Sequence, residues 1–176
     1  MADLTTYEIQ DFLQRLGHHY PHPGTFYLLG GSALCLLGSP RRTLDIDYTA
    51  TGAEHAAELQ AAIEALATEM RLELEAVAIE EFVPLPDDSA ARHQLLGRFG
   101  TLEVYIYDPY TIALSKVARG FETDLEDVVF LLRQNVINLA QLEDYVTAAL
   151  PQAWDFDIEP ADMQQHLAAV RKLLGV

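Results

Sequence analysis

Two short segments of the chain combine residue types and spacing that suit phosphate chemistry. Gly30-Gly31-Ser32 follows the apolar run 26–29 and opens a predicted helix. Asp45-Ile46-Asp47 lies in a strand-like run, where alternate side chains share one face, so Asp45 and Asp47 are expected to point the same way. A glycine turn offers backbone N–H groups to an anion, and paired carboxylates bind a divalent cation. Together the segments predict a site for a metal-bound nucleoside triphosphate.

The order of these segments resembles the polymerase-β-like nucleotidyltransferase superfamily, where Gly-Gly/Ser is followed roughly ten to fifteen residues later by Asp-x-Asp. Arg41-Arg42-Thr43 is similar to the Arg-x-Ser/Thr that precedes Asp-x-Asp in the small bacterial branch related to AbiEii-type toxins. A second block, from Asp108 through Lys116 and Arg119 to Asp127, is similar to the downstream lysine and aspartate motifs of that branch. The resemblance covers residues 26–132.

The resemblance implies a metal-dependent nucleotidyltransferase that moves a nucleoside monophosphate from an NTP to an acceptor. The acceptor is a small molecule, a protein or an RNA end, and a toxin-like member also implies a protein partner or antitoxin. Mg²⁺ (or Mn²⁺) is expected as cofactor, with Asp45, Asp47 and Lys116 as catalytic residues. The expected nucleotide-binding residues are Gly30, Gly31, Ser32, Arg42, Lys116, Arg119 and Asp124.

Active members of the superfamily complete the metal site with a third carboxylate from a neighbouring strand. Glu103, in Leu102-Glu103-Val104, is the first candidate for this metal ligand, and Asp108 is the second. Glu103 departs from the usual aspartate, and Asp108 before Pro109 also fits a helix cap. Glu73 and Glu75 are weaker candidates. This departure leaves a second hypothesis open, a catalytically degenerate nucleotidyltransferase-fold protein that acts as a nucleotide-binding or protein-interaction module.

Each candidate residue also has a purely structural interpretation. The glycine pair is also typical of a tight strand-to-helix turn, and Ser32 of a helix cap. Lys116 either contacts a nucleotide phosphate or pairs with Asp124 or Asp127. Arg42 either reaches a phosphate or neutralises the two aspartates. The second Asp-x-Asp of the chain, Asp155-Phe156-Asp157, precedes a helix start and is assigned no site.

The remaining residues with reactive side chains favour structural roles. His18, His19 and His22 are expected in a loop at a helix end, because their spacing does not fix a tetrahedral metal site. Cys35 lies among apolar residues and is expected to be a small buried hydrophobe. Three tyrosines in the second half of the chain either stack on a base or pack at the edge of the core, namely Tyr105, Tyr107 and Tyr110.

Composition limits the class of protein. The chain has 176 residues, half of them hydrophobic, and a net charge of −16. That charge argues against extensive nucleic-acid binding, which normally requires clustered lysine and arginine. No apolar run approaches the ~20 residues of a membrane helix, and the beginning of the chain does not look like a signal peptide. With one cysteine, a cytoplasmic protein with no membrane contact is expected.

The hydrophobic periodicity predicts an α+β fold, a nucleotidyltransferase-like small mixed β-sheet with helices packed mainly on one face and a C-terminal helical extension. A single domain over residues 1–176 is expected, with a core over about 22–135 and C-terminal helices over about 136–176. Strands are predicted at 26–29, 45–50, 72–77, 94–99 and 102–107. Helices are predicted at 7–20, 31–37, 54–70, 124–134, 139–150 and 160–174, with another that carries Lys116.

Overall fold

The computed structural model describes residues 4–176 and divides into two compact units. The sheet unit consists of Met1–Val77 and Gln94–Tyr107, of which residues 4 onward are described, and the helical unit consists of Ala78–His93 and Asp108–Val176. The expectation that the two form a single domain stays a prediction.

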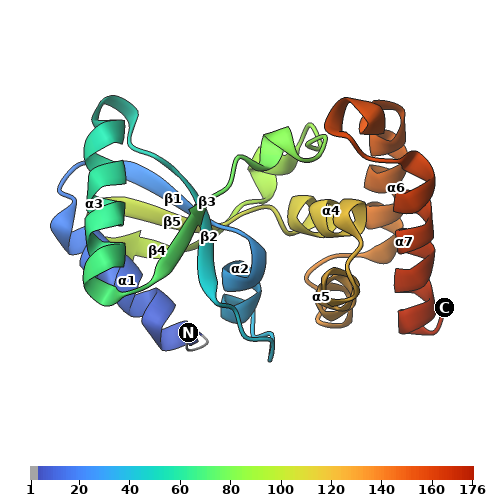
Figure 1. Ribbon diagram of the computed structural model, residues 1–176, viewed down its shortest axis with the longest axis horizontal. Helices are drawn as coiled ribbons and strands as arrows, with labels where there is room; N and C mark the ends of the chain where they lie inside the picture. Colours follow the sequence, from blue (N-terminus) through green and yellow to red (C-terminus); the bar gives the residue numbers. More distant parts are fainter. Residues whose placement is uncertain (1–3) are drawn as a thin grey trace. The chain divides into compact units, whose positions relative to one another are not determined.

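The sheet unit is built on a five-stranded mixed sheet with the order β3-β2-β1-β5-β4 (Figure 1). The strands are β1 (Gly24–Leu28), β2 (Asp45–Thr51), β3 (Glu73–Ala76), β4 (Gln94–Phe99) and β5 (Leu102–Ile106). Strand β1 pairs antiparallel with β2 and parallel with β5, while β2 pairs parallel with β3. Strands β4 and β5 form an antiparallel hairpin. The sheet therefore matches the predicted small mixed sheet.

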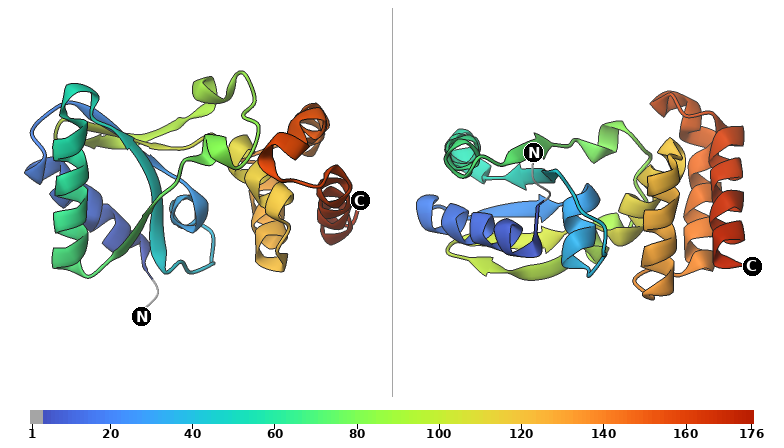
Figure 2. Two further views of the ribbon diagram at one scale, coloured as in Figure 1. Left: turned by 45° about the horizontal axis from the view of Figure 1, so that its top comes forward. Right: turned by 60° about the horizontal axis from the view of Figure 1, so that its bottom comes forward.

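Two helices, α1 (Thr6–His19) and α3 (Ala56–Met70), cover one face of this sheet (Figures 1 and 2). The first turn of α1 is closed by a capping box, in which the Thr5 side chain accepts a hydrogen bond from the Glu8 N–H and the Glu8 carboxylate accepts one from the Thr5 N–H. The short helix α2 (Gly30–Leu36) packs against β2. The helices are thus placed mainly on one face, as the sequence predicts.

Burial alternates along the central strands. Phe26, Leu28 and Ile46 are fully buried, and so are Leu102 and Val104 of β5. The residues between them in sequence, which include both aspartates, are half-buried. Because alternate side chains of a strand point to opposite faces, Asp45 and Asp47 share the face opposite the core. This confirms the expected orientation of the pair and the placement of Ile46 in the core.

The helical unit packs three α-helices around α4. Its elements are η2 (Ile79–Glu81), η3 (Ser89–Arg92), α4 (Pro109–Arg119), α5 (Glu122–Arg133), α6 (Leu139–Ala149), η4 (Leu150–Phe156) and α7 (Pro160–Leu174). Helix α4 contacts α5, α6 and α7. The predicted helices at 139–150 and 160–174 are confirmed to within a residue. The Asp155–Asp157 segment lies at the end of η4, outside any strand.

Asp108 caps the N-terminus of α4. Its buried carboxylate accepts hydrogen bonds from the N–H groups of Tyr110 and Thr111 and from the Thr111 hydroxyl. Arg92 donates two further hydrogen bonds to it, at 2.9 and 2.7 Å. These bonds occupy both carboxylate oxygens, so the cap interpretation of Asp108 is confirmed.

One predicted element begins later than expected. The helix predicted over 54–70 starts at Ala56, after a 3₁₀ turn over Ala53–His55. His55 is the N-cap of α3, with a φ of −112° and a ψ of 28° outside the helical region, so the helix begins after it. Within residues 4–176, no helix is both long enough and apolar enough to span a membrane.

Candidate functional site

The turn between β1 and α2 is shaped around Asp47. The N–H of Leu29 donates to the main-chain carbonyl of Asp47 at 3.0 Å. Gly30 follows with a φ of 50°, in the left-handed region that favours glycine. A Cβ atom at this position would overlap the carboxylate of Asp47. Residue 30 must therefore be glycine for the aspartate to take its place.

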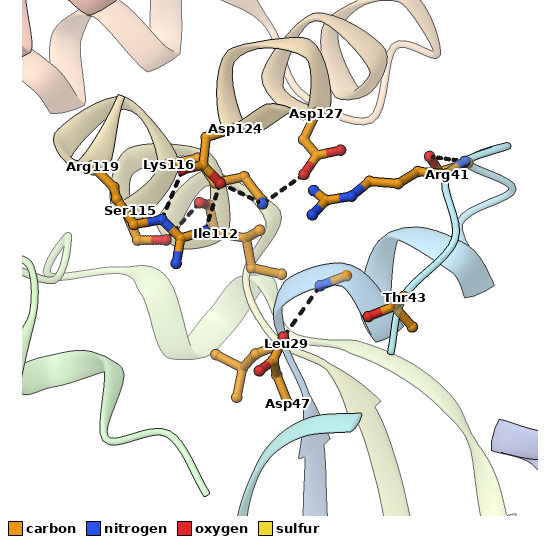
Figure 3. A network of polar contacts seen from close by, with 12 residues as sticks. Leu29, Arg41, Thr43, Asp47, Ile112, Ser115, Lys116, Arg119, Asp124 and Asp127 are labelled. Carbon is orange, nitrogen blue, oxygen red and sulfur yellow. Dashed lines mark hydrogen bonds and ion pairs between the residues drawn. The ribbon is translucent and has the colours of Figure 1, made fainter. Parts of the chain in front are cut away.

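The second glycine, Gly31, lies against both Asp47 and Thr43. The Gly31 N–H donates to Oδ2 of Asp47 at 3.3 Å (Figure 3), and a Cβ at Gly31 would lie only 2.6 Å from the Thr43 hydroxyl oxygen. That hydroxyl donates to the carbonyl and the carboxylate of Asp45, at 3.2 and 3.3 Å. The sequence interpretation placed Thr43 only within an Arg-x-Thr motif and missed its direct contact with the first aspartate.

Ser32 makes bonds within the turn. Its side chain is fully buried, and its hydroxyl donates to the carbonyl of Leu29 at 2.9 Å and to that of Asp47 at 3.3 Å. The bond to Asp47 joins α2 to β2, and the bond to Leu29 closes the first turn of α2. A role for Ser32 in nucleotide binding stays a prediction.

Three carboxylates gather beside the glycine turn. Oxygen atoms of Asp45, Asp47 and Glu75 all lie within 4.8 Å of one another. Glu75 reaches the pair because β3 runs parallel to β2, with Glu75 in register with Asp47 and Glu73 with Asp45. Carboxylate oxygens at this spacing repel one another, and they are the ligands that Mg²⁺, Mn²⁺ and Ca²⁺ prefer. The donor set fits a hard divalent cation.

The structure does not bring Glu103 to this group. Glu103 is in register with Thr25 at the start of β1, whereas Asp47 follows the end of that strand in the register. Its carboxylate accepts hydrogen bonds from Arg98 at 2.6 Å and from the Tyr105 hydroxyl at 3.2 Å. Burial, followed by the negative charge of Glu103, raises the pKa of Tyr105. Glu75, one of the weaker candidates in the sequence, is the third carboxylate of the group with Asp45 and Asp47.

Aromatic side chains continue the face that carries the aspartates. Tyr27 and Tyr105 are in register on β1 and β5, and their rings stack with centroids 5.6 Å apart. The ring of Tyr107 meets Tyr27 edge-on at 5.8 Å. In the register of the sheet, Tyr27 pairs with Thr49, two residues from Asp47, so these tyrosines share its face. The sequence interpretation named Tyr105 and Tyr107 but missed Tyr27.

In the helical unit, Lys116 is held between two aspartates (Figure 3). Its side chain is only 4% exposed, and its Nζ donates to Asp124 at 3.2 Å and to Asp127 at 2.7 Å. Both carboxylates are buried as well. The ion-pair interpretation of Lys116 is therefore confirmed for this structure.

Arg119 also binds Asp124, and its guanidinium group lies on the solvent-exposed side of the ion pairs formed by Lys116 with Asp124 and Asp127. It donates two hydrogen bonds to Asp124, at 2.7 and 2.6 Å, while 59% of its side chain stays exposed. Burial alone would raise the pKa of Asp124. The hydrogen bonds from Arg119 and the charges of Lys116 and Arg119 outweigh it and lower the pKa of that carboxyl below its ordinary value.

The remaining predicted residues lie in the sheet unit. Arg42 is exposed in the segment between α2 and β2. Cys35 is buried, as expected, and its thiol donates to the carbonyl of Arg41 at 3.2 Å. His18 and His19 are exposed, but they lie in the last turn of α1 and not in the loop expected for them. His22 instead lies against His55 and Glu58, an arrangement the sequence interpretation missed.

Comparison with known proteins gives one match. No curated protein and no solved structure is detectably similar to the chain. A protein-family model matches residues 6–164, which is most of the chain and includes the glycine turn, the carboxylate group and the Lys116 network. The chain therefore belongs to the family described as nucleotidyltransferase of unknown function (DUF6036).

Proposed function

We propose that the protein is a metal-dependent nucleotidyltransferase that transfers a nucleoside monophosphate from an NTP to an acceptor. Family membership supports the general reaction. A single observation carries the proposal: the carboxylates of Asp45, Asp47 and Glu75 lie close together beside the glycine turn. Side chains at the two glycines of that turn would collide with Asp47 and with Thr43.

The carboxylate group is the proposed site for Mg²⁺ or Mn²⁺, with Asp45 and Asp47 as the principal ligands and Glu75 in place of Glu103. A divalent cation held there would neutralise phosphate charge and assist departure of pyrophosphate. The chain's own contribution is to fix the ligands in advance. Thr43 orients Asp45 and the Gly31 N–H orients Asp47, so little reorganisation accompanies binding.

In the sheet unit, the glycine turn and exposed Arg42 are the proposed phosphate-binding elements. Gly30 and Gly31 carry no side chains of their own, the Asp47 carboxylate lies beside them and accepts the Gly31 N–H, and Ser32 holds the turn rigid through its two main-chain bonds. In the helical unit, Arg119, whose side chain is 59% exposed, is the proposed nucleotide contact. Lys116 belongs to the proposal as the buried cation that holds Asp124 and Asp127.

The acceptor is a small molecule, a protein side chain or an RNA end. The net charge of −16 makes a long nucleic-acid footprint the least favourable of these. A place in the AbiEii-related toxin branch, and with it an antitoxin partner, is part of the proposal on the strength of the Arg41-Arg42-Thr43 motif and the Lys116 block.

One observation favours a second candidate, a degenerate relative that binds a nucleotide or a protein and transfers nothing. Glu103 is engaged with Arg98 and Tyr105, and the third carboxylate, Glu75, comes from an exposed position on edge strand β3. A loosely held third ligand would weaken catalysis more than binding.

A thermal-shift experiment separates the candidates. The melting temperature is measured with each NTP, with and without Mg²⁺, for the wild type and for Asp45→Asn/Asp47→Asn. The control is Asp155→Asn/Asp157→Asn, which alters the other, exposed Asp-x-Asp of the chain. The proposal expects Mg²⁺-dependent stabilisation in the wild type and the control, and its loss in the Asp45/Asp47 variant.

Transfer is then measured as pyrophosphate release and as label incorporated from α-labelled NTPs in a cell extract. Release that depends on Asp45 and Asp47 supports the enzyme. Binding without release or labelling supports the degenerate relative. Equal stabilisation of the wild type and the Asp45/Asp47 variant would contradict the metal-dependent enzyme.

A further inference from the structure

A second group of metal-ligating side chains lies in the sheet unit, apart from the aspartates. His22 Nε2 and Glu58 Oε2 are 3.0 Å apart, and His55 Nδ1 and Glu58 Oε1 are 2.9 Å apart. The two nitrogens and a carboxylate oxygen all lie within 4.8 Å of one another. Both imidazoles thus direct one ring nitrogen to the same carboxylate.

The rings are held in a defined arrangement. The imidazoles of His22 and His55 stack face to face, with centroids 3.6 Å apart and planes only 2° from parallel. Tyr20 contacts the His22 ring edge-on at 5.6 Å, and the Thr101 hydroxyl donates to the His22 carbonyl at 2.6 Å. The His55 N–H donates to the Gly52 carbonyl at 2.8 Å. Both histidines are therefore fixed by contacts other than those with Glu58.

Three separate segments supply these side chains. His22 precedes β1, His55 ends the 3₁₀ turn after β2, and Glu58 lies in the first turn of α3. In the register of β1 and β2, Thr25 pairs with Thr51 at this end of the strands and Leu28 pairs with Tyr48 at the other, near the aspartates. The two groups are thus separated by the length of β1, about 15 Å for a strand of this size.

We propose that His22, His55 and Glu58 form a Zn²⁺ site that fastens the segment before β1 to the start of α3. Two imidazole nitrogens and one carboxylate oxygen are a donor set suited to zinc, with water as the fourth ligand, whereas Mg²⁺ prefers oxygen ligands alone. The side chains are 33%, 37% and 61% exposed, so an ion reaches them from solvent.

Binding requires a change of tautomer and a rotation of at least one imidazole out of the stack, because each nitrogen lone pair lies in the plane of its ring and the two rings are parallel. In the hydrogen-bonded arrangement, each bonded imidazole nitrogen carries the proton that it donates to Glu58. Zn²⁺ takes the lone pairs of His22 Nε2 and His55 Nδ1, and the protons move to His22 Nδ1 and His55 Nε2, so that both rings stay neutral. This site does not depend on the proposed transferase function.

The test is a zinc titration in competition with a chromophoric chelator, in the presence of excess Mg²⁺. The background variant is Asp45→Asn/Asp47→Asn, so that the other carboxylate group does not take up zinc. In this background the protein is expected to bind one equivalent of Zn²⁺ and to melt at a higher temperature with zinc than without it.

His55→Ala and Glu58→Gln are each expected to weaken zinc binding by at least about tenfold and to remove the thermal shift. His18→Ala is the matched control, because His18 is an exposed histidine near His22 that lies outside the cluster, and it is expected to bind zinc like the background. Equal affinity in the background and both cluster variants, or no bound equivalent in the background, would overturn the proposal.

Histidine NMR gives a second measurement that needs no cluster variant. With Zn²⁺, the ring ¹⁵N resonances of His22 and His55 are expected to exchange their protonated and unprotonated positions. Those of His18 and His19 should stay where they are. A uniform shift of all histidines, or none, would count against the site even if the cluster variants failed to fold.

Discussion

The carboxylate of Asp47 fills the space that a side chain at Gly30 would need. The relation is tight because Gly30 has a left-handed φ of 50° and the next residue, Gly31, donates its N–H to the same carboxylate. The glycine turn and the second aspartate are therefore one structural device. Neither keeps its geometry if the other changes.

Gly30→Ala tests this device, because the added methyl group meets the Asp47 carboxylate. Gly38→Ala is the matched control, since Gly38 also has a positive φ, of 91°, but its Cβ would meet nothing within 4 Å. Backbone strain costs about 1–3 kcal/mol at either position. We expect Gly30→Ala to lower the free energy of unfolding by at least about 1 kcal/mol more than Gly38→Ala does.

Urea denaturation of both variants measures this difference. Magnesium-dependent thermal stabilisation should also be lost in Gly30→Ala and kept in Gly38→Ala. Equal unfolding free energies in the two variants would mean that the contact with Asp47 adds nothing to the backbone strain.

Lys116 is expected to matter first for stability. Lys116→Met keeps the length of the side chain but leaves the buried carboxylate of Asp127 without its bond from Nζ. Removing one partner of a buried ion pair costs about 3–5 kcal/mol, and we expect a loss of this size in the urea-derived free energy of unfolding. The exposed Lys172→Met should change that energy little.

A second substitution distinguishes loss of charge pairing from loss of packing. Asp127→Leu in the Lys116→Met background removes the buried charge that Lys116 paired, so it should recover part of the lost stability. A further loss of stability in the double variant would show instead that packing around Asp127, and not its charge, is what Lys116 protects.

Acid should destabilise the protein partly through Asp124. The pKa of this carboxyl is lower in the folded protein than its ordinary value of 3.8. A group with a depressed folded pKa contributes stability above its unfolded pKa, and that contribution is lost as the pH falls through the folded pKa. The stabilising contribution of Asp124 is therefore complete near neutrality and declines once the pH falls below about 4.

The measurement compares the wild type with Asp124→Asn across the acid range. Asparagine cannot ionise, so the difference in unfolding free energy between the two proteins should shrink as the pH is lowered from about 5 to about 2. Other carboxyl groups with lowered pKa, such as Glu8 and Asp88, act equally in both proteins and cancel. A difference that stays constant with pH would contradict the role assigned to Asp124.

Local patterns predicted the elements of this fold well. The alternation around Ile46, the Asp108-Pro109 pair and the apolar spacing of the C-terminal helices each reflect a preference encoded within a few residues. The start of α3 was predicted two residues too early, at Glu54, because the hydrophobic spacing does not distinguish the 3₁₀ turn over Ala53–His55 from the first turn of the helix.

Pairings between distant segments were harder to predict. Glu75 joins the aspartates only because β3 pairs parallel with β2 in one register, and a shift of one residue would turn it to the opposite face. The approach of His55 and Glu58 to His22 likewise depends on how α3 follows β2. Glu103, by contrast, pairs with Arg98 across a short hairpin. The two residues are close in sequence, and the strands predicted at 94–99 and 102–107 already include them.

The choice between Glu75 and Glu103 as third carboxylate gives the last prediction. Glu75→Gln removes one of three clustered charges, so it should weaken Mn²⁺ or Mg²⁺ binding and, without metal, relieve repulsion between Asp45 and Asp47. Glu103→Gln breaks the pair with Arg98, an exposed contact that contributes under about 1 kcal/mol, and should leave metal binding unchanged. Glu73→Gln, on the same strand but outside the group, is the control for a change of net charge. Metal affinity is measured by Mn²⁺ electron paramagnetic resonance titration. Weaker binding in Glu103→Gln with no change in Glu75→Gln would contradict the prediction and identify Glu103 as the third metal ligand.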